Sequence, residues 1–284
     1  MKIALGTAQF GLDYGINNER GKIPLNEVIK LLDRCWETGI DVLDTAYAYG
    51  NSEKIVGDYI ANTGREFKVV SKLPNLNLAE LETAFYSSLE NLHLDHMYGC
   101  LIHDFDAFLE SPQIWDFFEK LKNENKIEKI GFSLYYPHEL EYLLSNGFEM
   151  DIIQIPYNVL DQRFQRYLPQ LKDMDMEVHV RSVFLQGLLF KKPEELQGSF
   201  AKIKNKAHIL RSLSAEMDVP LSAIYMNFVI LNEFVDNVII GVDGLKNLNE
   251  NISAIKYSNK VENILDDLVK LEENDEDIIL PINW

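Results

Sequence analysis

The amino-acid sequence predicts a (β/α)₈ barrel, a closed ring of parallel strands surrounded by helices, with residues 1–284 as a single domain. Short apolar runs and helical patterns alternate eight times along the chain. Several of the runs are apolar on both faces, which is typical of parallel strands covered by helices. The chain also has the usual size for this fold. A doubly wound open sheet is the alternative, but its dinucleotide-binding form carries a Gly-x-Gly-x-x-Gly turn that this sequence lacks.

The first half of the chain supplies four strands and their helices. The apolar run at 3–6 is the first strand, and a glycine-containing loop covers 7–24. Apolar side chains at helical spacing begin at Leu25, and Gly39 ends that helix. We expect Ser52 to cap the next helix. The remaining strands are expected at 41–43, 68–71 and 97–102, and the remaining helices at 53–61, 78–92 and 114–123.

The second half repeats the alternation and ends in an acidic tail. Proline is common in a first helical turn, so Pro137 is expected to begin a helix. Trp284, the last residue, could close over a substrate pocket or pack on the barrel. The strands are expected at 127–132, 151–155, 177–181 and 235–240, and the other helices at 163–173, 202–217, 221–231, 248–255 and 261–271.

Composition excludes several classes of protein. The net charge of -18 argues against nucleic acid and anionic membranes as main partners. Two cysteines, Cys35 and Cys100, suggest neither a disulfide scaffold nor a metal cluster. No apolar run is long enough for a transmembrane helix, and the start is too short in apolar residues for a signal peptide. We therefore expect a cytoplasmic protein.

Polar side chains stand where three consecutive strands end. The second strand leads to Asp44, the third to Lys72 and the fourth to His103, and Tyr49 follows in the loop after Asp44. Active sites of such barrels lie at the carboxyl ends of the strands, and neighbouring strands are about 4.8 Å apart, so these side chains can meet. Taken singly, each also fits a structural role, as a core histidine, an ion pair or a loop-packing tyrosine.

Together these four groups suit proton transfer to a substrate. A tyrosine with a pKa of about 10 is a weak acid at neutral pH, and a neighbouring ammonium is expected to lower that pKa. Asp44 can balance the charge of Lys72, and His103 can donate a hydrogen bond to a substrate oxygen.

Six segments in the expected order resemble the aldo-keto reductases, NAD(P)H-dependent (β/α)₈ enzymes that reduce carbonyl groups. The resemblance spans nearly the whole chain, and four active-site positions match residue by residue. The segments are Asp-Thr-Ala-x-x-Tyr-Gly-x-Ser-Glu (44–53), Ser-Lys-Leu (71–73), Leu-Ile-His-Asp (101–104), Gly-Phe-Ser (131–133), Gln-Ile-Pro-Tyr-Asn (154–158) and Gly-x₈-Glu-Asn (241–251).

The resemblance implies a role for each matching residue. Tyr49 would be the general acid, with Lys72 and Asp44 tuning it, and His103 would orient the carbonyl of a small-molecule substrate, for which a sugar-like carbonyl is one candidate. The cofactor would be NADP(H) or NAD(H), with Ser133 and Gln154 on the nicotinamide amide. The full set of expected cofactor contacts is Thr7, Ser133, Gln154, Arg181, Ser182, Gly241, Asp243, Asn247, Glu250 and Asn251.

The sequence also departs from the family pattern. Leu134 replaces the usual asparagine after the serine of the fifth strand. Arg181 stands where many members place an aromatic ring against the nicotinamide, and it could instead contact an anionic substrate or the cofactor pyrophosphate. Where members that grip a 2′-phosphate have basic residues, this chain has Asp243 and only Lys246. We also expect the N-terminal hairpin of many members to be absent.

Two other functions are alternatives for this sequence. A cofactor-binding redox-sensing subunit with little turnover would need no tuned acid. A metal-dependent hydrolase would need more histidine and carboxylate ligands than His103 and Asp44. The loops at 11–22, 104–112 and 186–200 and the tail shape the pocket, so the sequence leaves the substrate open. It also leaves the oligomeric state open.

Overall fold

The centre of the molecule is a closed barrel of eight parallel strands in sequential order, in which β1 pairs with both β2 and β8. The structure is a computed structural model that describes residues 2–16, 18, 20–74 and 76–284. The barrel confirms the predicted fold class. The strands are β1 Ile3–Gly6, β2 Val42–Asp44, β3 Lys68–Leu73, β4 Met97–Ile102, β5 Ile127–Ser133, β6 Ile152–Pro156, β7 Glu177–Arg181 and β8 Asn237–Ile240.

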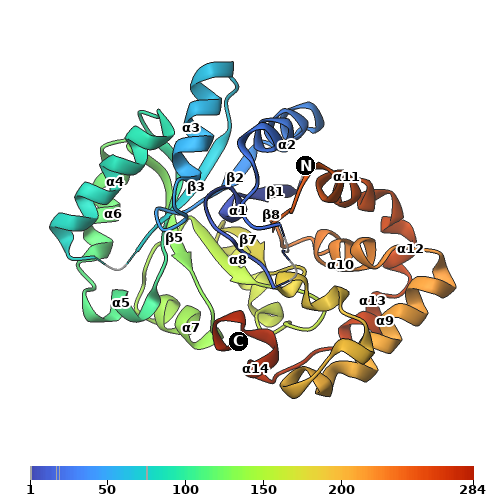
Figure 1. The fold of residues 1–284 in the computed structure, drawn as a ribbon. Coiled ribbons are helices and arrows are strands. Elements are labelled where there is room, and N and C mark those ends of the chain that lie inside the picture. Colours follow the sequence, from blue (N-terminus) through green and yellow to red (C-terminus); the bar gives the residue numbers. More distant parts are fainter. Residues whose placement is uncertain (1, 17, 19, 75) are drawn as a thin grey trace.

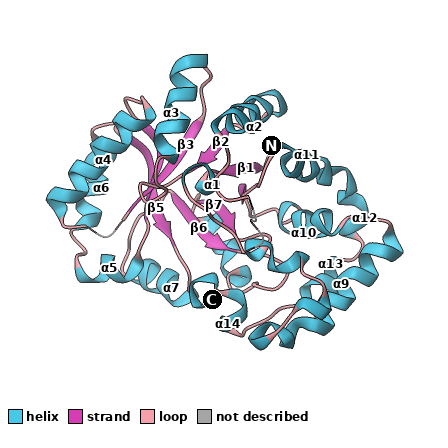
Figure 2. Ribbon diagram, viewed as in Figure 1, coloured by secondary structure: helices cyan, strands magenta, loops and turns pink. Residues whose placement is uncertain are grey.

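Helices surround the barrel, as Figures 1 and 2 show. At least one helix follows every strand, so the right-handed crossover of parallel strands is repeated around the ring. The helices are α1 Ala8–Gly11, α2 Leu25–Thr38, α3 Ser52–Thr63, α4 Leu78–Leu92, α5 Phe105–Glu110, α6 Ile114–Asn123, α7 Pro137–Ser145, α8 Leu168–Asp173, α9 Lys204–Met217, α10 Leu221–Ile230, α11 Leu245–Ala254, α12 Ser258–Glu262, α13 Leu265–Val269 and α14 Glu276–Ile279.

The helix α2 shows how the sequence pattern becomes packing. Val28, Leu31, Leu32 and Cys35 recur on one face, and all four are buried against the barrel. Gly39 ends the helix with a φ of 74°, and its N–H donates to the last carbonyl oxygens of the helix. The predicted end of this helix is confirmed.

Several predicted helices differ in their ends or are divided. The helix expected at 248–255 begins earlier, at Leu245. Those expected at 163–173 and 202–217 begin with 3₁₀ turns, η1 Gln165–Tyr167 and η4 Gly198–Ile203, and the one expected at 261–271 is divided into α12 and α13. Tight turns and interruptions depend on packing rather than on apolar spacing. The other 3₁₀ turns are η2 Leu185–Phe190, η3 Pro193–Glu195, η5 Ile255–Tyr257 and η6 Pro281–Asn283.

Two segments predicted as loops contain short helices, and one predicted cap is wrong. The segment 7–24 contains α1, and 104–112 contains α5, which Asp104 caps by accepting a hydrogen bond from the N–H of Ala107. Ser52 was expected as the cap of α3, but it is the first helical residue, and Asn51 holds the cap position. The hydroxyl oxygen of Ser52 instead lies 2.8 Å from the hydroxyl oxygen of Thr7.

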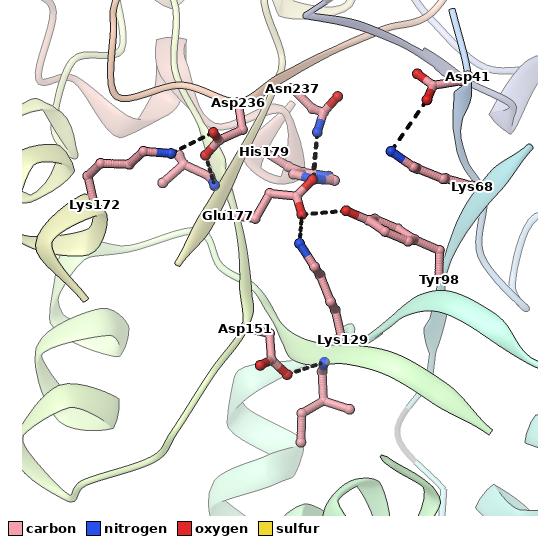
Figure 3. A network of polar contacts seen from close by, with 12 residues as sticks. Asp41, Lys68, Tyr98, Lys129, Asp151, Lys172, Glu177, His179, Asp236 and Asn237 are labelled. Carbon is pink, nitrogen blue, oxygen red and sulfur yellow. Dashed lines mark hydrogen bonds and ion pairs between the residues drawn. The ribbon is translucent and has the colours of Figure 1, made fainter. Parts of the chain in front are cut away.

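Polar side chains close the end of the barrel opposite to the carboxyl ends of the strands. There Glu177 accepts hydrogen bonds from Tyr98 at 2.7 Å, from His179 and Asn237 at 2.8 Å each, and from Lys129, as Figure 3 shows. These residues come from β4, β5, β7 and β8. The network joins four strands at one point.

An apolar layer separates this network from the carboxyl ends of the strands. It consists of Ala4, Val42, Val70, Leu101, Ile152 and Ile239. Because these side chains fill the barrel, the interior is a packed core, and chemistry is confined to its open end.

Candidate active site

A cleft of about 390 Å³ opens at the carboxyl ends of the strands. Strand ends from all round the barrel contribute to it. All the residues predicted for the site line this cleft, namely Thr7, Asp44, Tyr49, Lys72, His103, Ser133, Gln154, Arg181, Ser182, Gly241, Asp243, Asn247, Glu250 and Asn251. Their roles in catalysis or binding remain predictions.

A buried ion pair lies at the floor of the cleft. The Nζ of Lys72 donates to a carboxylate oxygen of Asp44 at 2.6 Å and to the carbonyl oxygen of Thr45 at 2.9 Å. The other carboxylate oxygen of Asp44 accepts a hydrogen bond from the Gln154 amide at 2.7 Å. The exposed fraction of the Lys72 side chain is only 1%. Such a pair is stable only if its hydrogen-bonding groups are satisfied, which they are here.

The ring of Tyr49 lies above this pair and beside His103. Its centroid is 5.3 Å from the Nζ of Lys72 and 6.3 Å from the imidazole centroid. Two glycines fix the Tyr49 loop against α1. A Cβ added to Gly11 would lie 1.8 Å from the carbonyl oxygen of Tyr49, and Gly50 has a φ of 58°. Only glycine allows this close approach, so the backbone itself positions the phenol.

The expected lowering of the Tyr49 pKa by Lys72 does not occur in this structure. Burial raises the pKa of Tyr49, and the Asp44 carboxylate raises it further, against a smaller opposing effect of Arg181. The charge of Lys72 is largely balanced by Asp44, so it does not overcome the effect of burial on the phenol. Tyr49 is therefore neutral at ordinary pH and holds the proton that a general acid must donate.

The imidazole of His103 is also neutral. Burial lowers the pKa of His103 to about 4, and the positive charges of Lys72 and Arg181 contribute to the same shift. A neutral imidazole can donate one hydrogen bond from a ring nitrogen without carrying a charge. That is the form needed to orient a carbonyl oxygen.

Ser133 and Gln154 present polar groups suited to an amide. The hydroxyl of Ser133 donates to the Gln154 carbonyl oxygen at 3.3 Å, a long hydrogen bond that an incoming amide can replace. The side chain of Leu134 is apolar and fully buried in the core, so it offers the cleft no side-chain polar group, as the sequence indicates. Two polar side chains on neighbouring strands thus fit the amide of a nicotinamide.

The segment after β8 forms the other end of the cleft, at the beginning of α11. Glu27 of α2 accepts a hydrogen bond from the backbone N–H of Leu245, and Arg20 pairs with Glu27 at 2.7 Å. Arg20 also donates to the carbonyl oxygen of Asp243 at 3.0 Å, and the Asp243 side chain bonds to Gln9. The cleft therefore runs from the phenol to a helix N-terminus, an extended shape that fits a dinucleotide.

The structure adds residues that the sequence analysis missed. Tyr14, Tyr135 and Gln186 line the cleft near Tyr49, together with Gln9, Phe184 and Phe190. The Gln186 amide donates to the Tyr14 hydroxyl at 3.1 Å, which joins the loop at 11–22 to η2. Residues 17 and 19 of that loop lie outside the described residues. Because these contacts join loops far apart in the chain, no local sequence signal could have found them.

Other predicted features are placed as follows. Trp284 packs edge-to-face on Phe200 at 5.2 Å and is not among the residues that line the cleft. Within the described ranges, histidine, cysteine and carboxylate side chains form no group of three or more able to hold a metal ion. In the same part of the chain, no helix has the length and apolar character needed to cross a membrane.

Comparison with known proteins identifies relatives over most of the chain. The model of the aldo/keto reductase family matches residues 2–270. The uncharacterized oxidoreductase YqkF of Bacillus subtilis (strain 168) is 27% identical over 261 residues, which are 81% of this chain and 82% of that protein. The NADH-specific methylglyoxal reductase of Escherichia coli (strain K12) is 28% identical over 218 residues, 66% of this chain and 65% of that protein.

A solved structure agrees with the barrel. The aldo-keto reductase AKR11C1 from Bacillus halodurans, in its holo form, matches with a TM-score of 0.77 at 20% sequence identity. The match covers 97% of this chain and 94% of that chain. At this identity the likeness bears on the fold alone.

Proposed function

The chain belongs to the aldo/keto reductase family and is an NAD(P)H-dependent oxidoreductase, and we propose that it reduces an aldehyde or ketone to an alcohol with Tyr49 as the proton donor. The observation that carries this proposal is the meeting of Asp44, Lys72, His103 and Tyr49 at one end of the cleft. A protein that only bound a cofactor would not need a neutral phenol beside a buried ammonium.

The four side chains then divide the proton chemistry between them. The bound nicotinamide supplies the hydride. His103 donates a hydrogen bond to the carbonyl oxygen and so fixes its position. Tyr49 gives its proton to that oxygen as negative charge develops there, and Lys72 stabilises the phenolate that remains. Asp44 holds Lys72 in place through the 2.6 Å contact.

The first carbonyl compounds to test are small aldehydes. A methylglyoxal reductase is among the relatives, which supports 2-oxoaldehydes. The family resemblance also supports sugar-like carbonyls such as glyceraldehyde. A panel of both kinds with each nicotinamide cofactor would establish which is reduced.

Replacing Tyr49 by phenylalanine tests the assignment of the proton donor. Because the phenolic proton is needed only as the alkoxide forms, Tyr49→Phe should lower kcat by about 10²- to 10⁴-fold. The Kd of the cofactor, measured by nicotinamide fluorescence, should stay nearly the same. Tyr86→Phe is the matched control, because Tyr86 lies exposed on α4. Near-normal turnover of Tyr49→Phe would contradict the proposal.

A wild-type protein that bound cofactor but reduced nothing in the panel would favour the redox-sensing alternative.

For the cofactor, we propose that discrimination in favour of NADPH is weak and that NADH is accepted well. A 2′-phosphate would meet Asp243 after β8, and Glu27 already binds the N–H at the beginning of α11. Like charges repel, whereas the 2′-hydroxyl of NADH can donate a hydrogen bond to a carboxylate. Arg20, which donates to the carbonyl oxygen of Asp243, is paired with Glu27.

The remaining proposals concern the whole protein. A cytoplasmic location, which cell fractionation can test, stays a prediction, as does the lack of nucleic-acid binding. Residues 1–284 as a single domain should unfold in one cooperative transition.

A further inference from the structure

We propose that the substrate carries a carboxylate next to its carbonyl group and that Arg181 binds this carboxylate. The inference rests on the proposed carbonyl reduction and adds the chemical class of its substrate.

Arg181 stands at the reaction end of the cleft. It is the last residue of β7, and it lines the cleft together with Tyr49 and His103. All three residues face the same cleft, and the positive charge of Arg181 lowers the pKa of both Tyr49 and His103. A group bound to Arg181 would therefore lie close to the carbonyl that these two residues receive.

The guanidinium is held in place but keeps free donors. One terminal nitrogen donates to the carbonyl oxygen of Leu134 at 2.9 Å, and the other donates to the Ser182 hydroxyl at 3.3 Å. The guanidinium carbon lies 4.1 Å from the centroid of the Tyr135 ring, a cation–π contact that fixes its plane. These two bonds use two of its five N–H groups, so donors remain for a carboxylate.

No carboxylate among the residues that the structure describes is paired with Arg181. Its contacts with the described residues come from Leu134, Ser182 and Tyr135, and none of these is a carboxylate. Lys72 is balanced by Asp44. The other carboxylates that line the cleft, Asp243 and Glu250, belong to the segment after β8. Among the described residues, the reaction end thus has one uncompensated positive charge.

The single positive charge of Arg181 suits one kind of substrate anion better than another. In a chain with a net charge of -18, an anion gains nothing from the overall field and must be held by a local group. A single guanidinium matches a carboxylate, which carries one negative charge and accepts paired hydrogen bonds. A phosphate monoester carries nearly two, so it would need a second cation. The structure therefore points to 2-oxo acids and related acid aldehydes.

Matched acids and esters test the inference. The pairs are glyoxylate with methyl glyoxylate and pyruvate with methyl pyruvate, which share a carbonyl but differ in charge. The measured quantity is the ratio of kcat/KM for the acid to kcat/KM for its ester. We expect the wild type to favour the acid, and Arg181→Gln to reduce the ratio by roughly 10- to 100-fold, the usual effect of losing a charge-assisted hydrogen bond.

Two further variants and one binding measurement complete the test. Arg181→Lys keeps the charge but not the planar fork, so it should recover part of the ratio. Arg166→Gln, which removes an exposed arginine that pairs with Glu141, should leave the ratio as in the wild type. An equal loss for acid and ester, accompanied by weaker NADH binding in fluorescence titration, would show that Arg181 serves the cofactor and would overturn the inference.

The outcomes also separate this inference from the proposed function. Two results would contradict the carboxylate assignment alone. In the first, the wild type reduces the esters but not the acids. In the second, its preference for glyceraldehyde 3-phosphate over glyceraldehyde is stronger than its preference for acid over ester. A wild type that reduces none of these compounds, and none of the carbonyl panel, contradicts both proposals.

Discussion

At the scale of single residues, Lys72 carries a buried charge that depends on its hydrogen-bond partners. Its Nζ has two oxygen partners in the fully buried floor of the cleft. Removing one partner of a buried ion pair leaves an uncompensated charge, which typically costs about 3 to 5 kcal/mol. We therefore expect both stability and activity to depend on this ammonium, and a test must separate them.

We predict that Lys72→Met loses turnover and is less stable to urea, while the double variant Lys72→Met/Asp44→Asn recovers most of the stability but none of the turnover. The double variant has no unpaired carboxylate, but it still has no cation to stabilise the phenolate. Urea unfolding and steady-state kinetics measure the two effects. Recovery of turnover in the double variant would show that the charge is not needed.

Residue identities at the site could be predicted, but their electrostatics could not. The order of Asp44, Tyr49, Lys72 and His103 along the chain indicates proton chemistry, and the structure brings all four together. The pKa of Tyr49 is raised rather than lowered because burial and the Asp44 carboxylate outweigh the opposing charge of Arg181. Burial is a property of the folded molecule, and no local pattern gives it.

At the scale of an element, the proposed choice of cofactor depends on the segment after β8. We predict that the wild type prefers NADPH by less than about a hundredfold, and that Asp243→Ser or Glu27→Gln shifts affinity toward NADPH because each removes a negative charge near the expected 2′ position. The Kd values of both cofactors measure this. Asp267→Asn, which changes an exposed carboxylate on α13, is the control.

One result would contradict this prediction. A wild-type preference for NADPH above about a hundredfold, roughly 2.7 kcal/mol, that neither substitution changed would show that these carboxylates face away from the 2′ position.

A second prediction at this scale concerns Glu177, the first residue of β7, at the opposite end of the barrel. Burial alone would raise the pKa of the Glu177 carboxyl, but hydrogen bonds from His179, Lys129 and Tyr98 outweigh it and hold that pKa well below its usual value. A depressed folded pKa stabilises the protein above the unfolded pKa of about 4.3, and this stabilisation is lost as pH falls further.

We therefore predict that Glu177→Gln lowers the free energy of unfolding by about 2 to 4 kcal/mol at pH 7, and that the difference from wild type shrinks at pH 3. Urea unfolding at both pH values measures it. Glu128→Gln, on the exposed face of β5, is the control and should change little. A difference that stayed constant with pH would contradict the linkage to this carboxyl.

Element boundaries were predicted unevenly. Where one face of a helix packs on the barrel and glycine ends it, as in α2, the sequence predicted both the helix and its end. The helix at 261–271 was predicted but its division into α12 and α13 was not, and the short helices α1 and α5 were missed. These are four to six residues long, too short for an apolar period to be recognised.

For the whole molecule, the net charge of -18 predicts an effect of salt on cofactor binding. A negative protein repels the anionic cofactor, and raising the ionic strength from 10 to 150 mM shortens the Debye length from about 30 Å to about 8 Å. The association rate of NADH, measured by stopped-flow fluorescence, should therefore rise a few-fold. The KM of the neutral methyl pyruvate should change little. A fall in the association rate of NADH with rising salt would mean that cations near the cleft, rather than the net charge, dominate its association with the protein.

The barrel, the order of its strands and the residues at their ends could all be predicted from the amino-acid sequence. These follow from strand–helix alternation, which repeats within short stretches of chain, and from the rule that parallel strands end at one rim. How those residues act on one another depends on the folded structure. The raised pKa of Tyr49, the carboxylate of Glu27 at the beginning of α11 and the unbalanced charge of Arg181 beside Tyr135 all arise between segments far apart in the chain. Distance and burial set such interactions, and both exist only once the chain has folded.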